Sequence, residues 1–337
     1  MEDPAETQRD HDALAKLIGA APAFLKAIER VPLIARTESP VIITGETGTG
    51  KELAARAVHY LSPRAPFPFV AVNCGALTET LLEDELFGHE RGAFTNADRS
   101  RQGLIVEAVR GTLFLDEIDS LPFKAQTDLL RVIQDNLFRA VGSNRQQNAN
   151  VRIVAATNRS LELLIVAGTF RPDLYYRLSV FSIQLPPLRD RVEDILLLAH
   201  HFLLKHMPHK IMELTDRACS RLQSYKWPGN VRELENAIIR GVHYSQKGRI
   251  DTEDLGLAPD SSDTSPPSFA RSLRTAKKEV VETFERDYLI RLMSEHRGHV
   301  SKAAAAAKKE RRDLGKLLKR YGIDPELYRP ATRRQAG

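Results

Sequence analysis

A glycine-rich stretch, GETGTGKE at residues 45–52, constrains the fold of this chain more than any other feature. An apolar run, Val41–Thr44, leads into it, and an amphipathic helical pattern follows it. Glycines let the backbone N–H groups of such a loop point inward, a lysine reaches terminal phosphates, and the next helix directs its positive end at the anion. The pattern therefore predicts a phosphate loop on an α/β sheet. The predicted nucleotide-binding residues within it are Gly45, Glu46, Thr47, Gly48, Thr49, Gly50, Lys51 and Glu52.

One position of this loop departs from the usual pattern. Glu52 stands where a loop of this spacing commonly has the serine or threonine that ligates Mg²⁺. By the strict rule one metal ligand is missing, and the alternative is a glycine-rich turn that merely starts a helix. The strand-like run before the loop and the apolar pattern after it favour the phosphate loop.

Four further apolar runs have the composition and length of buried strands. They are Phe69–Val72, Thr112–Leu115, Val151–Ala156 and Phe181–Leu185. Helical or longer segments separate them, which is typical of parallel strands. Together with the run before the phosphate loop they predict a five-stranded parallel sheet covered by helices, with the nucleotide at the carboxyl ends of the strands.

Two acidic residues, Asp116 and Glu117, follow the third of these predicted strands. An aspartate that leaves a buried strand beside a phosphate loop can hold Mg²⁺, and an adjacent glutamate can orient or deprotonate the attacking water. An apolar run followed by Asp-Glu is also common in purely structural settings. The pair therefore indicates catalysis only in combination with the phosphate loop.

The segment ELFGHERGAFTNA, residues 85–97, lies between these two motifs, and its glycines interrupt any helix. Phe94 lies there among small and polar residues, with no periodic pattern that would bury it. An exposed aromatic residue on a loop indicates a contact surface. We therefore expect this loop to contact a partner.

The composition is that of a globular chain with two or three domains, since 337 residues with 42% hydrophobic content can bury a large core. Apolar runs stop at about six residues, against the roughly 20 that a membrane span requires. The start of the sequence does not resemble a signal peptide, and we expect a cytoplasmic protein. Cys74 and Cys219 form no metal-like pair, which argues against a disulfide framework or a zinc site.

Positive charge is concentrated at the C-terminal end. Residues 271–337 contain 18 lysines and arginines against 9 acidic residues, whereas residues 1–270 contain 31 against 35. A basic tail on a mildly acidic body is typical of a polyanion-binding module, although a merely solvated tail is the alternative. Residues 257–270 before this tail have linker composition.

Five segments together carry a family resemblance: GETGTGKE, ELFGHERGAFTNA, GTLFLDEID, AATN and WPGNVREL, in this order. They resemble the AAA+ domain of bacterial enhancer-binding proteins, the activators of sigma-54 RNA polymerase. The resemblance covers roughly residues 17–256 and implies an ATPase that uses ATP and Mg²⁺. That family also carries glutamate at the position of Glu52, so the missing ligand no longer argues against ATP.

The resemblance implies roles for individual residues around the nucleotide. Asp116 and Glu117 match the family's Walker B motif, with Asp116 at Mg²⁺, and Asn73 matches the asparagine that pairs with the Walker B glutamate. Thr157 and Asn158 match its first sensor. Arg232, in the first turn of a predicted helix after the WPGN turn, matches its second sensor. Within that turn, Asn230 and Glu233 look like a capping box.

Two arginines and the contact loop extend the resemblance beyond one subunit. Arg171 and Arg177 match arginine fingers that reach the nucleotide of a neighbouring subunit, which implies a homo-oligomer, by analogy a hexameric ring. Without the family, surface salt bridges would be the favoured reading of these arginines. Phe94 and Thr95 match the residues that contact sigma-54.

The basic tail is similar in length and order to the Fis-type helix-turn-helix that ends many of these activators. Three helical patterns follow each other: one with Phe284, Leu289, Leu292 and Met293, then Val300–Ala307 and Arg311–Arg320. The predicted DNA-contacting residues are Arg311, Arg312, Lys316 and Lys319.

The tail departs from the Fis-type pattern at three positions. Lys308 and Lys309 replace the usual turn glycine and apolar residue, and Gly315 falls inside the third helix, at a cost of about 1 kcal/mol against alanine. A three-helix basic module without specific DNA recognition is therefore the alternative.

The predicted domains follow from these boundaries. They are a polar segment at 1–16, an AAA+ α/β subdomain at 17–188, a helical lid at 189–256, a linker at 257–275, a helix-turn-helix domain at 276–325 and a tail at 326–337. Only about 16 residues precede the AAA+ part, so we expect control by expression level or by a regulatory partner protein acting in trans.

We predict an ATP-dependent activator that binds enhancer DNA and remodels the closed promoter complex of sigma-54 RNA polymerase. The rival is a DNA-binding regulator whose AAA+ body does not engage sigma-54 and acts as a repressor or scaffold. Asn96 supports the rival, because the family's loop usually reads GAFTGA and this loop reads GAFTNA. Asparagine tolerates positive φ, so the loop geometry can survive the change.

Overall fold

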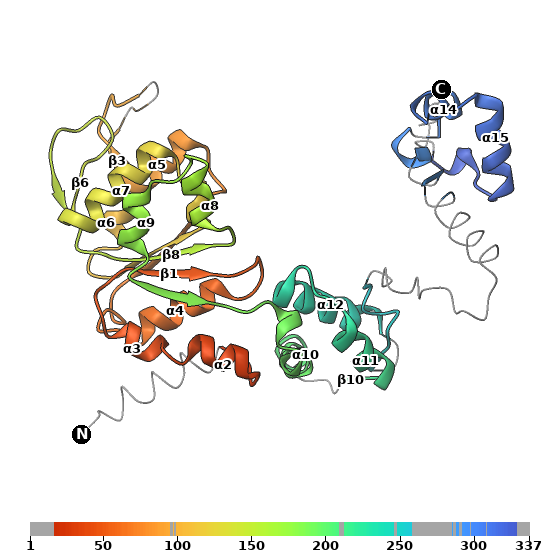
Figure 1. Cartoon of the computed structure of the whole chain (residues 1–337), viewed down its shortest axis with the longest axis horizontal. Helices are drawn as coiled ribbons and strands as arrows, with labels where there is room; N and C mark the ends of the chain where they lie inside the picture. The colour runs from red at the N-terminus through yellow and green to blue at the C-terminus, as the bar shows by residue number, and fades with distance from the viewer. Residues whose placement is uncertain are drawn as a thin grey trace, which may run out of the picture. The chain divides into compact units, whose positions relative to one another are not determined.

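The computed structural model gives the chain as two compact units that divide after Ala258 (Figure 1). The structure describes residues 17–94, 97, 99–208, 212–245, 248–257, 285, 288–289, 292–296, 298–307 and 309–328. None of the helices in these ranges is long and apolar enough to cross a membrane.

A five-stranded parallel sheet lies at the centre of the first unit, in the order β2-β5-β8-β1-β9. Its strands are β1 (Val41–Thr44), β2 (Phe69–Asn73), β5 (Thr112–Asp116), β8 (Arg152–Thr157) and β9 (Phe181–Gln184). These are the five runs predicted as strands, displaced by no more than one residue at either end. The predicted fold class is confirmed.

Both faces of the sheet are covered, because successive side chains of a strand point to opposite faces. Val41, Ile43 and Phe114 pack under one layer, while Ile42 and Leu113 pack under the other. The first layer comprises α2 (Pro22–Ile28), α3 (Val31–Ala35) and α4 (Lys51–Tyr60). The second comprises α5 (Glu79–Phe87), α6 (Leu104–Glu107), α7 (Phe123–Asp135), α8 (Leu161–Val166) and α9 (Pro172–Leu178). The two layers lie on opposite sides of β1 and β8 in Figure 1.

The apolar residues between Leu17 and Ala35 recur at helical spacing in the sequence, which predicts helix there, and this stretch folds as two short helices. A proline lies in the first turn of each, Pro22 in α2 and Pro32 in α3. Proline has no N–H and suits a first turn, but it disrupts a helix interior. Leu25 belongs to the predicted apolar pattern, yet it is 47% exposed, so that part of the pattern is wrong.

Two small antiparallel pairs project from the α/β part. β3 (Gly88–His89) pairs with β4 (Arg101–Gln102), and β6 (Leu137–Phe138) pairs with β7 (Gln147–Asn148). A single bridge between His89 and Val141 joins the two pairs. The predicted contact loop is therefore anchored to a second hairpin. A one-turn 3-10 helix, η1 (Ile118–Ser120), follows β5.

A helical lid completes the first unit around the fully buried Trp227. Its elements are η2 (Leu188–Asp190), α10 (Glu193–His206), β10 (Glu213–Leu214), α11 (Asp216–Ser224), α12 (Asn230–Tyr244) and β11 (Arg249–Ile250). Glu233 does reach back over the start of α12, where it accepts from Gly229 N at 2.8 Å. Asn230 gives α12 no side-chain cap, so the capping-box prediction is wrong for that residue.

The described part of the second unit contains α14 (Val300–Ala306), α15 (Arg311–Arg320) and η3 (Pro325–Tyr328). Leu289, Leu292 and Met293 are buried against these helices, as the pattern predicts. Leu314 and Leu318 are the buried residues of α15. Phe284 lies outside the described residues.

Candidate active site

The phosphate loop packs directly against the lid. Gly48 has φ 80°, and a Cβ there would lie 2.3 Å from Gly229 O. Gly48 O also accepts from Val231 N at 3.0 Å. Gly50, with φ 102°, is the left-handed residue from which α4 begins. These contacts and angles exclude a side chain at Gly48 and favour glycine at Gly50.

Lys51 points back into this loop. Its Nζ donates to Gly45 O at 2.8 Å and to Glu46 O at 3.1 Å. Burial lowers the pKa of the ammonium, and the negative charges of Asp116 and Glu117 partly offset that effect. The loop therefore already directs a desolvated cation at the position where phosphates bind in such loops.

Asp116 and Asn73 lie side by side, because they are register partners at the ends of β5 and β2. Asp116 Oδ1 accepts from Glu117 N at 3.0 Å. Glu117 has φ 54°, a left-handed conformation that costs a residue with a side chain about 1–3 kcal/mol. Such strain commonly marks functional sites.

The left-handed conformation carries the Glu117 carboxylate across to β2. A Cβ on Gly75 would lie 2.2 Å from Glu117 Oε2, and Asn73 Oδ1 accepts from Gly75 N at 2.8 Å. Asn73 and Glu117 thus meet around Gly75. Sequence reasoning missed Gly75, since a glycine three residues into a loop carries no motif.

The Asp116 carboxylate fits a Mg²⁺ site. Mg²⁺ commonly takes one or two carboxylates together with substrate phosphates, and Asp116 is close enough to influence the charge of Lys51. No group of three or more His, Cys, Asp or Glu side chains among the described residues could form a metal cage. The residues therefore suit a metal that arrives with a nucleotide.

The two first-sensor residues connect β8 to the loop and to η1. Asn158 Nδ2 donates to Thr47 Oγ1 at 2.9 Å. Thr157 Oγ1 donates to Asp119 Oδ1 at 2.6 Å. Asp119 was not predicted, although it lies two residues after the Walker B glutamate.

Arg232 lies at the same loop from the side of the lid. It is exposed on the first turn of α12, and its Cβ would be 3.2 Å from a Cβ on Gly48. Its positive charge contributes to lowering the Lys51 pKa. The structure therefore brings Lys51, Asp116, Glu117, Asn158 and Arg232 together around the phosphate loop.

A clamp that the sequence did not reveal holds the loop to the lid. Arg189 donates to both carboxylate oxygens of Glu46, at 2.8 and 2.6 Å. Asn230 Nδ2 donates to Thr47 O at 3.0 Å and to Glu46 Oε2 at 3.2 Å. Asn230 Oδ1 accepts from Leu188 N at 2.8 Å. The hydrogen bond from Arg189, and to a lesser extent the one from Asn230, lowers the Glu46 pKa. Through these bonds the side chain of Glu46 links the phosphate loop to the lid.

An apolar cavity of about 400 Å³ adjoins the phosphate loop at Thr49 and Gly50. Its apolar walls come from the N-terminal segment, α4 and the lid, through Leu17, Ile18, Phe24, Leu53, Leu185, Leu198, Phe202 and Val231. Buried Arg191 also lines it and donates to Thr49 O at 3.1 Å. The size and lining suit a small planar ligand. No motif marked this cavity, because its walls are far apart in sequence.

Arg171 and Arg177 do not belong to this cluster. Arg171 binds both oxygens of Asp173, at 3.0 and 2.7 Å, and also contacts Thr127. Arg177 is exposed at the end of α9. None of the hydrogen bonds found among the described residues links either arginine to the phosphate loop of its own chain.

The contact loop places Phe94 at the surface. Phe94 is 46% exposed, and its ring packs edge-on against His89, with centroids 4.9 Å apart. Ala93 lies against the second hairpin, where a Cβ on Gly142 would be 2.7 Å from it. The predicted contact residue Thr95 and the unusual Asn96 lie outside the described residues.

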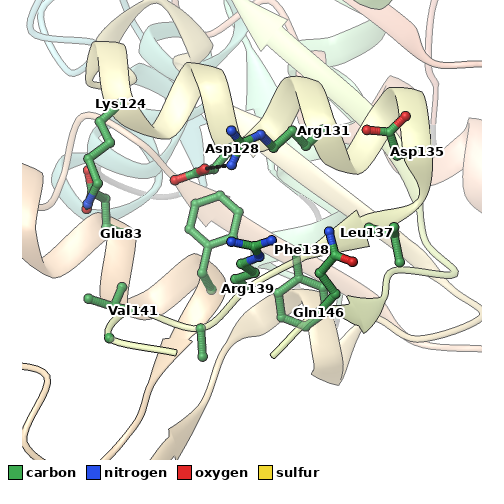
Figure 2. A pocket seen from close by; sticks show the side chains of 13 residues that line it. Glu83, Lys124, Asp128, Arg131, Asp135, Leu137, Phe138, Arg139, Val141 and Gln146 are labelled. Atoms are coloured by element: carbon green, nitrogen blue, oxygen red, sulfur yellow. Dashed lines mark hydrogen bonds and ion pairs between the residues drawn. The ribbon is translucent and has the colours of Figure 1, made fainter. Parts of the chain in front are cut away.

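A charged cleft of about 410 Å³ lies between α5, α7 and the second hairpin (Figure 2). Lys124 pairs with Glu83, and Arg131 lies 3.6 Å from Asp128. Desolvation is the main cause that raises the Asp128 pKa. Val141 also lines the cleft, which therefore adjoins the hairpin that supports the contact loop. Two ion pairs thus lie in the cleft, and no cysteine, serine or threonine is among its lining residues.

The four predicted DNA-contacting residues, Arg311, Arg312, Lys316 and Lys319, are all exposed on α15. Lys316 pairs with Asp313 at 3.2 Å. A Cβ on Gly315 would meet nothing within 4 Å, and α15 continues through it. The glycine therefore does not interrupt the helix.

Comparisons with known proteins agree with this geometry. Residues 17–184 match the Sigma-54 interaction domain family, and residues 189–272 match the AAA+ ATPase lid domain. Regulatory protein AtoC of Escherichia coli strain K12 is 43% identical over 90% of this chain and 67% of its own length. Transcriptional regulatory protein GlrR of the same strain is 43% identical over 97% of this chain and 72% of its own. The crystal structure of NtrX from Brucella abortus in complex with ATP has a TM-score of 0.66 at 34% identity, covering 94% of this chain and 73% of that one.

Proposed function

Because the chain belongs to the sigma-54 interaction family of AAA+ ATPases, and is thereby an ATP-driven activator of sigma-54-dependent transcription, we propose how its residues do this work. ATP binds with its phosphates on the loop around Lys51 and its base in the adjoining apolar cavity. Hydrolysis repositions the Phe94 loop against sigma-54 and remodels the closed promoter complex. The observation that carries this proposal is the convergence of Lys51, Asp116, Glu117 and Arg232 on one loop.

The chemistry is phosphoryl transfer to water. Lys51 and the loop amides hold the phosphates, and Glu117 orients the attacking water and accepts its proton. Asn73 sets the position of Glu117 through their shared contact with Gly75. Mg²⁺, held by Asp116, would neutralise charge on the phosphates. Asn158, bonded to Thr47, and Arg232 sense whether the terminal phosphate is present.

We further propose that the site is completed by a neighbouring subunit, by analogy in a hexameric ring. Arg171 and Arg177 support this: Arg171 immediately precedes α9 and is partly exposed, Arg177 is exposed on α9, and both stand apart from the nucleotide cluster of their own chain. An arginine finger supplied across an interface contributes about 10³–10⁵ in rate.

Enhancer DNA is the proposed ligand of α15, because Arg311, Arg312, Lys316 and Lys319 are all exposed on this one short helix. A regulatory partner acting in trans and a cytoplasmic location complete the proposal.

Trapping of purified sigma-54 in the presence of ADP and aluminium fluoride tests the assignment of Phe94. Phe94→Ala should abolish trapping while ATP hydrolysis continues, because burying an exposed phenylalanine contributes about 1.5–3 kcal/mol. Asn96→Gly, which restores the commoner loop sequence, should preserve or raise trapping. Failure of both the unmodified protein and Asn96→Gly to trap sigma-54 would instead support a regulator that does not engage this sigma factor.

A further inference from the structure

His89 makes two side-chain hydrogen bonds that a neutral histidine cannot make together. Its Nδ1 faces Asp84 Oδ1 on α5, and its Nε2 lies 2.8 Å from Arg99 O, on the far side of the contact loop. A carboxylate and a carbonyl oxygen both only accept, so each ring nitrogen has to donate. Neutral imidazole carries a single N–H. One additional proton is therefore held between His89 and Asp84.

A positively charged side chain, Arg101, lies beside this pair. Arg101 on β4 lies 3.9 Å from Asp84 Oδ2, and it also binds both oxygens of Glu85 on α5. Asp84 therefore contacts His89 on one side and faces Arg101 on the other. The side chains of His89 and Asp84 are only 10% exposed, so water screens the pair little.

The same ring supports the exposed aromatic residue of the loop. Phe94 packs against His89 in an edge-to-face arrangement, with ring centroids 4.9 Å apart and an interplanar angle of 64°. His89 is fixed from a second side, because Val141 N donates to Gly88 O and Glu90 N donates to Val141 O. Val141 lies at the edge of the charged cleft in Figure 2.

We propose that His89 is a positioning residue for sigma-54 engagement. Its ring ties α5 to the returning side of the contact loop through two hydrogen bonds and forms the support on which Phe94 is presented. This inference rests on the proposed role of Phe94. It adds a requirement that the proposed function does not contain: sigma-54 engagement needs a hydrogen bond from each ring nitrogen of His89.

Two isosteric variants test the requirement, because each keeps one of the two donors. The amide nitrogen of His89→Asn takes the place of Nδ1, and that of His89→Gln takes the place of Nε2. Each variant should lower sigma-54 trapping by the full-length protein with ADP and aluminium fluoride about tenfold or more, since a hydrogen bond to a charged group is lost. ATP hydrolysis should remain, which also shows that the variants fold. His200→Asn, at an exposed histidine that bonds only Leu196 O, is the matched control.

A third variant separates charge from shape. In Asp84→Asn the amide oxygen can accept from Nδ1 or the amide nitrogen can donate to it, so the ring no longer needs its second proton. Asp84→Asn should therefore trap sigma-54 better than His89→Asn or His89→Gln, since both ring nitrogens can keep a hydrogen-bond partner. In ¹⁵N-histidine spectra of the full chain, the resonances absent from His89→Gln should show both ring nitrogens protonated.

These outcomes distinguish a failure of the proposed role of His89 from a failure of the proposed role of Phe94. Normal trapping by Phe94→Ala would show that the assigned contact residue is wrong. Loss of trapping by Phe94→Ala, together with normal trapping by either His89→Asn or His89→Gln, would overturn the role of His89 alone. A neutral ring in the spectra would do the same.

Discussion

The nucleotide site and the basic face of α15 hold their charges in opposite ways. In the nucleotide site, charged side chains are fixed by other groups: Lys51 by two carbonyls of its loop, and Glu46 by Arg189 and Asn230. On α15 the four predicted DNA-contacting cations are exposed, and the one ion pair found for them among the described residues joins Lys316 to Asp313 of the same helix.

The difference follows from what each region has to do. Phosphoryl transfer requires groups held in place before the reaction, because reorganisation would cost rate. Binding a polyanion requires charge density, and mobile side chains can supply it while counterions are released. Single substitutions should therefore be severe in the nucleotide site and graded on α15.

The largest effect is expected at Arg177, which is exposed like the cations of α15 but is proposed to act in catalysis. Arg177→Ala should lower ATP turnover per subunit about 10³–10⁵-fold, because the finger acts on a neighbour's nucleotide. Mixing Arg177→Ala with Lys51→Ala should restore part of the activity, since each variant lacks what the other supplies. Turnover measured over a range of protein concentrations checks both points, with exposed Arg30→Ala as control. Full activity of a strictly monomeric preparation would rule out action in trans.

Glu117→Gln should reduce turnover about 10²–10⁴-fold with little change in ATP affinity, because the amide keeps the shape but cannot accept the proton. Lys51→Ala should instead weaken ATP binding itself, since the loop loses its cation. Calorimetric titration and single-turnover kinetics separate the two effects. Similar, near-normal turnover in both variants would contradict the assignment of one ATPase site.

Asn230→Ala tests the clamp between the lid and the loop. The variant removes one buried and two partly buried hydrogen bonds, and leaving a buried partner unpaired costs about 1–3 kcal/mol. We expect a roughly tenfold or greater loss in ATP affinity, measured by titration. Asn236→Ala, at an exposed position of the same helix, should have no such effect. Equal ATP affinities for the two variants would show that the clamp is not needed for binding.

On α15 the expected effects are smaller and depend on salt. Arg312→Ala and Lys316→Ala should each reduce the log–log slope of DNA affinity against salt by about one, if each cation contacts one phosphate. Lys226→Ala in the lid, at an exposed lysine, serves as control. A truncated chain of residues 1–256 that still binds operator DNA would place the DNA site elsewhere.

The smallest effect is expected at an uncharged position of α15, Gly315. Gly315→Ala should stabilise α15 by about 0.5–1 kcal/mol, because the new methyl group meets open space and alanine loses less entropy than glycine. Slower amide hydrogen exchange along α15 in the full chain would report this. Faster exchange would mean that the glycine has a packing role.

The sequence by itself determined the sheet and the motif positions. The strands were predicted to within one residue. Each is a short apolar run with polar residues at both ends, and a strand that is buried on both faces of a sheet has this composition. The phosphate loop and the acidic pair were also predictable, since their chemistry depends on residues adjacent in the chain.

Only the tertiary structure decided which distant groups complete the site. Leu17 and Leu198 line one cavity, and Asn230 bonds the phosphate loop instead of capping its own helix. The close approach at Gly75 comes from the carboxylate of Glu117, which directly follows the neighbouring strand. The periodicity of the sequence shows which face of a helix or strand is apolar. It does not show which polar groups will meet, because that depends on which elements pack together. The partner of a polar side chain is fixed by packing over long sequence separations, and no local spacing encodes it.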